Sequence, residues 1–121
     1  MASLKLTQSR SQLRIRRLVV FRFPRIVPGQ SVTTNAFTAI GAVTTGEVIV
    51  SQSPAAGSIA TPRVRYQIVN AVTGRPVTNS ITLVGTRTAV LRFVVPAGTF
   101  RLRITNVGTG AVAVNGVIIV F

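Results

Sequence analysis

Few side chains in this sequence could do acid–base or nucleophilic chemistry. It contains no His, Cys or Asp, and Glu47 is the only acidic residue among the 121. A triad hydrolase needs a base and an orienting carboxylate, and a glycosidase needs two carboxylates, so both classes are excluded. Tyr66 and Lys5 remain as groups that exchange protons, but Tyr66 has the parity of a core residue and Lys5 lies close to the N-terminus. The sequence therefore predicts no catalytic site and no enzyme activity.

The sequence also contains few residues that could bind a metal or a cofactor. Without His or Cys, a metal site would depend on hard oxygen ligands, namely Glu47, the Phe121 carboxylate and neutral oxygens. The glycines form no phosphate-binding pattern, since Gly108 and Gly110 fit a turn between strands. We therefore expect no metal and no cofactor.

Positive charge is the strongest chemical feature of the chain. Lys and Arg number 14 against the single acid, which gives a formal net charge of +13, and seven of these bases lie in residues 1–28. Charge of one sign at this density indicates a polyanionic partner or an assembly that binds counter-ions. Arg contacts phosphate well, and the neighbouring Phe21 and Phe23 could stack on bases. The candidate polyanion-binding residues are Arg14, Arg16, Arg17, Arg22 and Arg25.

Composition and periodicity predict an all-β fold. Val, Ile and Thr together make up more than a third of the residues, and these β-branched side chains favour strands. Several segments alternate apolar and polar residues, as strands with one face on a core do. This alternation predicts inward positions for Phe93, Phe100 and Leu102 and outward positions for Arg63, Arg65, Arg101 and Arg103. Pro96-Ala97-Gly98 supplies a short turn, at which we expect a hairpin. The expected strands are 63–69, 89–95 and 99–107, with shorter ones at 47–51 and 79–83 and a weaker candidate at 31–43.

Residues 1–28 are interpreted as a basic N-terminal arm or connector that carries a strand at about 13–23. One parity of this strand is apolar apart from Arg17, with Arg14, Arg16 and Arg22 on the other. The Pro28-Gly29 pair then separates the arm from a β-sandwich domain at 29–121. An apolar row on an arm is expected of a donor strand that completes a neighbour's sheet. The alternative, that this stretch is the first strand of the chain's own sandwich, stays open.

The C-terminal segment is apolar on both faces from Val117 to Phe121. One face of a sheet in a sandwich normally meets water, so such a strand needs cover on both sides. It lies either at the centre of a two-sheet core or beneath another subunit. The candidate subunit-interface residues are Leu13, Ile15, Val19, Phe21, Phe23, Val117, Ile118, Ile119, Val120 and Phe121.

Three features together are similar to a known architecture: the strand from Leu13 to Phe23, the Pro28-Gly29 hinge and the strand from Val117 to Phe121. They resemble the small jelly-roll subunits of donor-strand fibres such as bacterial endospore appendages. A basic arm before a jelly roll also resembles small viral coat proteins. The resemblance implies a jelly-roll-like β-sandwich with an N-terminal extended arm.

Two functions remain open. The first is a non-enzymatic structural subunit that self-assembles into a filament or other polymer by exchange of the N-terminal arm strand. The alternative is a nucleic-acid-binding or capsid-like protein that uses the Arg-rich arm. The expected partners are other copies of the chain and nucleic acid or another polyanion, but no membrane, because no apolar run approaches ~18 residues. With no secretory signal recognised, we expect synthesis in the cytoplasm, with a fibre on the cell or spore surface as one destination.

Overall fold

Strands account for the regular secondary structure of the part of the chain that the structure describes. The computed structural model describes residues 15–121, and within this range it contains no helix, so no segment there could cross a membrane as a helix. The strands are β1 (Arg17–Ile26), β2 (Ser31–Thr33), β3 (Phe37–Ala39), β4 (Thr44–Pro54), β5 (Arg63–Asn70), β6 (Ile81–Val84), β7 (Arg87–Val95), β8 (Gly98–Asn106) and β9 (Val112–Val120).

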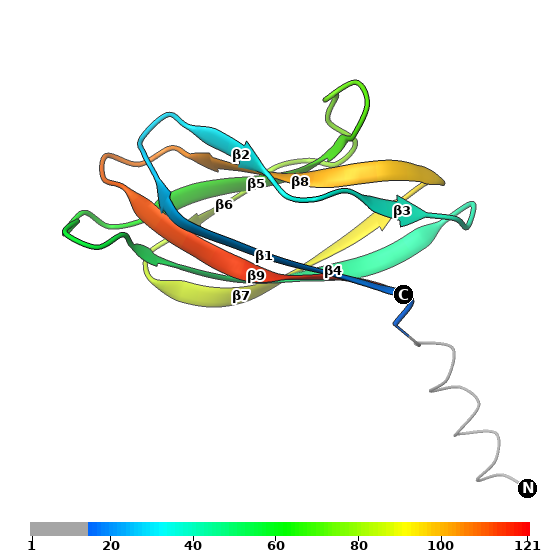
Figure 1. The fold of residues 1–121 in the computed structure, drawn as a ribbon, viewed down its shortest axis with the longest axis horizontal. Helices are drawn as coiled ribbons and strands as arrows, with labels where there is room; N and C mark the ends of the chain where they lie inside the picture. Colours follow the sequence, from blue (N-terminus) through cyan, green and yellow to red (C-terminus); the bar gives the residue numbers. More distant parts are fainter. Residues whose placement is uncertain (1–14) are drawn as a thin grey trace, which may run out of the picture.

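These strands form two antiparallel sheets that pack face to face (Figure 1). Sheet A has the order β1-β9-β4-β7, and sheet B has the order β2-β8-β5-β6, with β3 also paired to β8. The chain passes from one sheet to the other at most of its connections, so strands adjacent in sequence seldom pair. This connectivity is that of a jelly roll, and it confirms the predicted all-β, jelly-roll-like sandwich.

The turn at Pro96-Ala97-Gly98 connects the two sheets and makes no hairpin. Strand β7 pairs with β4 in sheet A, whereas β8 pairs with β5, β2 and β3 in sheet B. The hairpin prediction was wrong, because a turn sequence reverses the chain without deciding whether the flanking strands pair. Placed in opposite sheets, the apolar sides of β7 and β8 both face the shared core, and Phe93 and Phe100 are buried there.

The predicted arm strand lies within the chain's own sandwich. Strand β1 pairs with β9 from Arg17 to Phe23, and Phe21 is only 5% exposed. Within the described residues the strand begins at Arg17 and continues to the fully buried Ile26, so residues 17–26 of the predicted arm lie in the sandwich. The physical reason is that its apolar side chains need cover, which sheet B supplies. Residues 1–14 lie outside the described range.

Two glycines make room for phenylalanine rings on the inner face of sheet A. Gly46 of β4 lies opposite Phe93 of β7, and Gly116 of β9 lies opposite Phe21 of β1. A Cβ at either glycine would overlap that ring and a backbone carbonyl of the neighbouring strand. Phe93 in turn packs on Phe37 of sheet B, with the ring centroids 5.6 Å apart. The aromatic core thus joins the two sheets.

A buried amide provides the polar connection between the sheets. Gln52 of β4 accepts a hydrogen bond from the Tyr66 hydroxyl at 2.8 Å. Its Nε2 donates to the carbonyl oxygens of Leu83 and Gly85, at 3.0 and 2.8 Å. Because each polar atom of the Gln52 side chain has a partner, its burial is compensated.

Candidate interaction surfaces

The few groups with acid–base chemistry lie apart. Glu47 points outward from sheet A, and its Oε2 accepts a hydrogen bond from Arg92 Nε at 3.2 Å. Tyr66 lies in the core, where burial raises the pKa of its hydroxyl above the ordinary value. Lys5 lies outside the described residues. Residues 15–121 contain no group of three or more His, Cys, Asp or Glu side chains that could hold a metal. The described groups therefore provide no acid–base pair.

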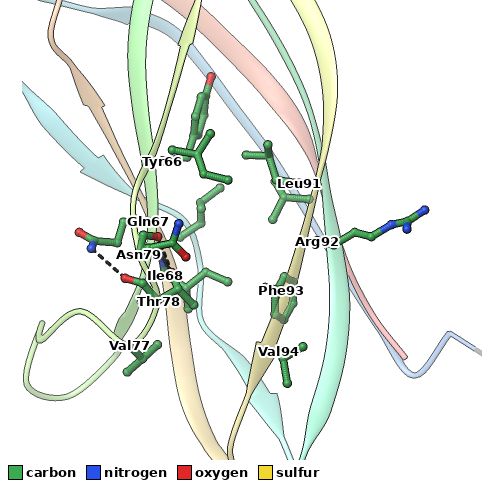
Figure 2. Close-up of a pocket in the computed structure, with 13 residues that line it drawn as sticks. Tyr66, Gln67, Ile68, Val77, Thr78, Asn79, Leu91, Arg92, Phe93 and Val94 are labelled. Carbon is green, nitrogen blue, oxygen red and sulfur yellow. Dashed lines mark hydrogen bonds between the residues drawn. The ribbon is translucent and has the colours of Figure 1, made fainter.

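A cavity of about 420 Å³ opens between the sheets, beside β7 and the segment that precedes β6. Figure 2 shows Leu91 and Phe93 of β7 facing Ile68 of β5 across it, while Arg92 points away. Thr78 fixes one wall, because its Oγ1 accepts the Ile68 N–H at 3.1 Å. The cavity offers mainly apolar contact, and of its two ionisable side chains Tyr66 is buried and Arg92 points away.

The outer side of sheet A carries an aliphatic face. Across the four strands, Val20 of β1 lies beside Val117 of β9, Val117 beside Ile49 of β4, and Ile49 beside Val90 of β7. Leu18 and Ile119 form a second row next to it. The solvent-exposed fraction is 75% for Val20, 57% for Leu18 and 52% for Val90. The aliphatic face is defined by Leu18, Val20, Ile49, Val90, Val117 and Ile119.

The outer side of sheet B carries an arginine face instead. Arg63 and Arg65 project from β5, and Arg101 and Arg103 project from β8, because the residues between them are buried in the core. Gln67 lies opposite Arg103 in the pairing of β5 with β8. The chain's only acid is on sheet A, so no acidic side chain faces these bases. The arginine face is defined by Arg63, Arg65, Arg101 and Arg103.

Hydrogen bonds hold two of these guanidinium groups in place. Arg103 Nη2 donates to Gln67 Oε1 at 2.8 Å, and Arg101 Nη1 donates to the Thr34 carbonyl at 2.9 Å. A guanidinium has five N–H donors, so each group keeps donors for an external ligand. The bonds reduce the side-chain entropy that a ligand would otherwise have to remove.

The residues predicted for a subunit interface divide between core and surface. Phe21, Ile118 and Val120 are buried in the chain's own core, and Val19 and Phe23 pack against that core. As interface residues these five stay a prediction that depends on strand exchange. Of the remaining residues, Val117 and Ile119 are half-buried and belong to the aliphatic face, Ile15 is exposed, Phe121 is half-buried, and Leu13 lies outside the described residues.

The predicted polyanion-binding residues are spread along β1. Arg16 and Arg17 line a hollow of about 290 Å³ together with Phe121 at the end of β9. Arg22 and Arg25 are exposed farther along the strand, and a strand spans roughly 26 Å from residue 17 to residue 25. Arg14 lies outside the described residues. These bases therefore do not converge on one ligand position.

No protein-family model matches the chain, and no curated protein matches it in sequence. Among solved structures, it is similar to a chain of the infectious bursal disease virus particle, at 13% identity and a TM-score of 0.51, over 88% of this chain and 30% of that one. A family GH115 4-O-methyl-alpha-glucuronidase is 15% identical with a TM-score of 0.47, over 80% of this chain and 14% of that one. A family 35 carbohydrate binding module from Clostridium thermocellum is 14% identical with a TM-score of 0.41, over 84% and 97%.

These likenesses concern the fold. The chain spans less than a third of the first two structures, and every identity is too low to transfer a function. The likeness to the virus particle agrees with the observed sheet order, and together they define the chain as a jelly-roll β-sandwich. None of these three structures is an appendage subunit, so the likeness to endospore appendages stays a prediction.

Sequence reasoning missed two features of these surfaces. It selected the odd-numbered apolar residues of the first strand, whereas Leu18 and Val20, on the even parity, are the exposed ones. The signal was present, because residues 18–21 are apolar on both parities. It also noted outward arginines on the body strands without grouping Arg63 with Arg65 as a site.

Proposed function

We propose that this protein is a non-enzymatic structural subunit that self-assembles, with the aliphatic face of sheet A as one of its subunit contacts. The observation that carries the proposal is the row Val20, Val117, Ile49 and Val90, which crosses the whole sheet on the side away from the core. Contiguous exposed apolar patches on a soluble fold mark interaction sites. A second copy of the chain placed on this row would remove it from water.

Charge also favours contact through sheet A. The subunit carries a net charge of +13, so copies repel one another unless they meet through a weakly charged surface. On the outer side of sheet A the charge of Arg92 is offset by Glu47, which lies 3.2 Å away, while Arg22 of β1 is an exposed base there without an acidic neighbour. The outer side of sheet B has four arginines and no acid. Two copies therefore approach with less repulsion through the outer side of sheet A than through that of sheet B.

A capsid-like shell is the form of assembly that the comparison favours. The supporting observation is the likeness in fold to a chain of the infectious bursal disease virus particle. A filament of the appendage type is the other form. Negative-stain microscopy of the purified, nuclease-treated protein distinguishes a closed shell from a fibre, and particles of neither kind at any concentration or salt would contradict the proposal.

The contact is tested by adding charge to the aliphatic face. V20K/V90K places two ammonium groups in the exposed row, and we expect it to remain monomeric in sedimentation velocity where the wild type associates. I59K/V72K is the matched control, because Ile59 and Val72 are exposed aliphatic residues outside the strands and the charge added is the same. Equal association of the two variants would remove the aliphatic face from the interface.

Exchange of β1 between subunits is the finer mechanism, and one observation favours it. Strand β1 is an edge strand whose sole partner within sheet A is β9, so the β1 of a neighbour could form the same pairs. Such an exchange would also give Val19, Phe21 and Phe23 the role of filling a neighbour's core. The exchanged strand would use the same contacts that β1 makes with β9 within one chain.

A disulfide across the β1–β9 pair tests this exchange. Arg22 and Asn115 lie directly opposite each other and are exposed, and the chain contains no cysteine. In oxidised R22C/N115C assemblies, strand exchange predicts covalent multimers on a non-reducing gel. A single monomeric band with no free thiol would show that the pair forms within one chain and would exclude exchange. R22C alone is the control for accidental cross-linking.

A further inference from the structure

A polar hollow of about 610 Å³ lies at one end of the arginine face. It is formed by β5, β6 and the turn that follows β8. Arg63 and Arg65 supply its charge, while three threonines supply hydroxyl groups. The full lining is Thr61, Arg63, Arg65, Thr82, Val84, Val107, Gly108 and Thr109.

The turn that bounds this hollow is held firmly. Asn106 is completely buried, and its Nδ2 donates to the carbonyls of Ile26 and Gly110, at 2.8 and 2.9 Å. Its Oδ1 accepts the Gly108 N–H at 2.9 Å. The Val107 N–H donates to the Arg63 carbonyl at 3.0 Å, which fixes the turn against β5. The hollow is therefore formed before any ligand arrives.

Glycine at position 108 favours the close approach of turn and strand. A Cβ there would lie 3.2 Å from the Arg63 Cβ and 3.3 Å from its backbone nitrogen. Such distances are shorter than ordinary carbon contacts, so a larger residue would push the turn away from Arg63. The position of the turn that forms this wall is therefore linked to the position of the Arg63 Cβ.

Charge in this hollow has no counterpart within the chain. Arg63 and Arg65 are both exposed, and Arg101 and Arg103 continue the same positive surface on β8. Glu47, the only acid, lies on the opposite sheet and contacts Arg92. An anionic ligand would relieve the repulsion among these four guanidinium groups.

We propose that the hollow binds the sugar–phosphate backbone of nucleic acid, without regard to base sequence, through Arg63 and Arg65. Alternate residues on a strand lie about 6.7 Å apart, close to the separation of successive phosphates along an extended single strand. Guanidinium groups bind phosphate oxygens through paired hydrogen bonds, and hydroxyl groups such as those of Thr61, Thr82 and Thr109 add further phosphate contacts. No aromatic side chain lines the hollow, so it offers no stacking platform for bases.

The lining fits nucleic acid better than a protein or a membrane. Protein interfaces depend on buried aromatic or aliphatic anchors, and the hollow supplies only Val84 and Val107. Binding to a membrane surface requires apolar or aromatic side chains that insert into the lipid next to the basic residues. The inference is independent of the proposed self-assembly, because the hollow and the aliphatic face lie on different sheets.

The test compares two variants of the full chain that lose the same charge. R63Q/R65Q removes the bases of the hollow. R75Q/R92Q is the matched control, since Arg75 lies in an exposed loop and Arg92 lies on sheet A. Binding of a fluorescein-labelled, single-stranded oligothymidylate is followed by anisotropy over a range of salt concentrations, at protein concentrations where sedimentation shows monomers. Thermal melts establish that both variants fold.

Loss of two phosphate contacts has a defined signature in this experiment. For R63Q/R65Q we expect the slope of log K against log salt to become less steep by about 1.4, and the affinity at about 0.1 M salt to fall on the order of twentyfold. The control variant should change both quantities far less. Equal effects in the two variants would overturn the proposal, because binding would then follow net charge alone. The proposal would also be overturned if R63Q/R65Q lowered the affinity for heparin and left the affinity for the oligonucleotide unchanged.

Discussion

The outer faces of the two sheets differ in chemistry although the sheets share one core. Sheet A presents aliphatic residues from all four strands, together with the chain's only acid. Sheet B presents arginines from its two central strands, β5 and β8, and no acid. Both sheets have alternating strands, so half of their residues face the core and half are free to differ. This difference is the basis for proposing a different partner for each outer face.

The two proposed contacts assign different roles to the charge on the two sheets. On the outer side of sheet A, where copies of the chain are proposed to meet, Glu47 offsets Arg92 and Arg22 adds one further base beside the aliphatic rows. On sheet B, where a polyanion is proposed to bind, four bases gather without a counter-charge. One chain can therefore self-associate and bind an anion without the two contacts competing.

The largest expected effect comes from disturbing the core that both faces share. Gly46→Ala would force a methyl group into the Phe93 ring and the backbone of β9, and overpacking of this kind costs about 1–3 kcal/mol. We expect a matching decrease in the free energy of unfolding, measured by urea denaturation. Gly41→Ala is the control, because a Cβ there makes only ordinary contacts and Gly41 has no positive φ. Equal stability of the two variants would contradict the close packing of sheet A.

An intermediate effect is expected at alkaline pH, through the buried link between the sheets. Burial raises the pKa of Tyr66 in the folded state, so the unfolded chain loses this proton first, near pH 10. Stability should be complete below that pH and should then fall by up to about 1.4 kcal/mol per pH unit. Tyr66 is the only tyrosine, so Tyr66→Phe should lose this slope while paying a constant cost for the missing bond to Gln52.

Urea denaturation of the wild type and of Tyr66→Phe between pH 9 and 11 measures that slope directly. Lys5 is the only lysine, which leaves few other groups that titrate in this range. If both proteins lose stability equally across the range, the Tyr66 hydroxyl does not carry the alkaline sensitivity.

The smallest effect is expected from a change of Glu47, the single acid, which lies beside the aliphatic face. Arg92 is 83% exposed in its pair with Glu47, and exposed ion pairs contribute little, so Glu47→Gln should change the free energy of unfolding by less than about 1 kcal/mol. Association of the variant should weaken with its higher net charge, most strongly at low salt. A large loss of folding stability would show that Glu47 serves the fold rather than the surface.

Much of the fold could be predicted from strand alternation and turn residues. Phe93, Phe100 and Leu102 were correctly expected to face inward, and Arg101 and Arg103 outward, because alternation in a strand assigns opposite faces. The pairing of β7 and β8 was predicted wrongly, since the same turn serves a hairpin or a crossing between sheets. Neither candidate surface was predicted as a unit, because both are assembled from strands far apart in sequence.

The sequence by itself determined what this protein lacks and how its side chains alternate. A chain with no His, Cys or Asp has no groups for most catalytic chemistry, whatever its fold. Only the tertiary structure decided that Val20, Val117, Ile49 and Val90 form one row, and that Arg63 and Arg65 share a hollow with Thr109. Alternation specifies the side of a strand on which a residue lies, whereas its neighbours on that side are set by strand order and register, which depend on the packing of the whole core.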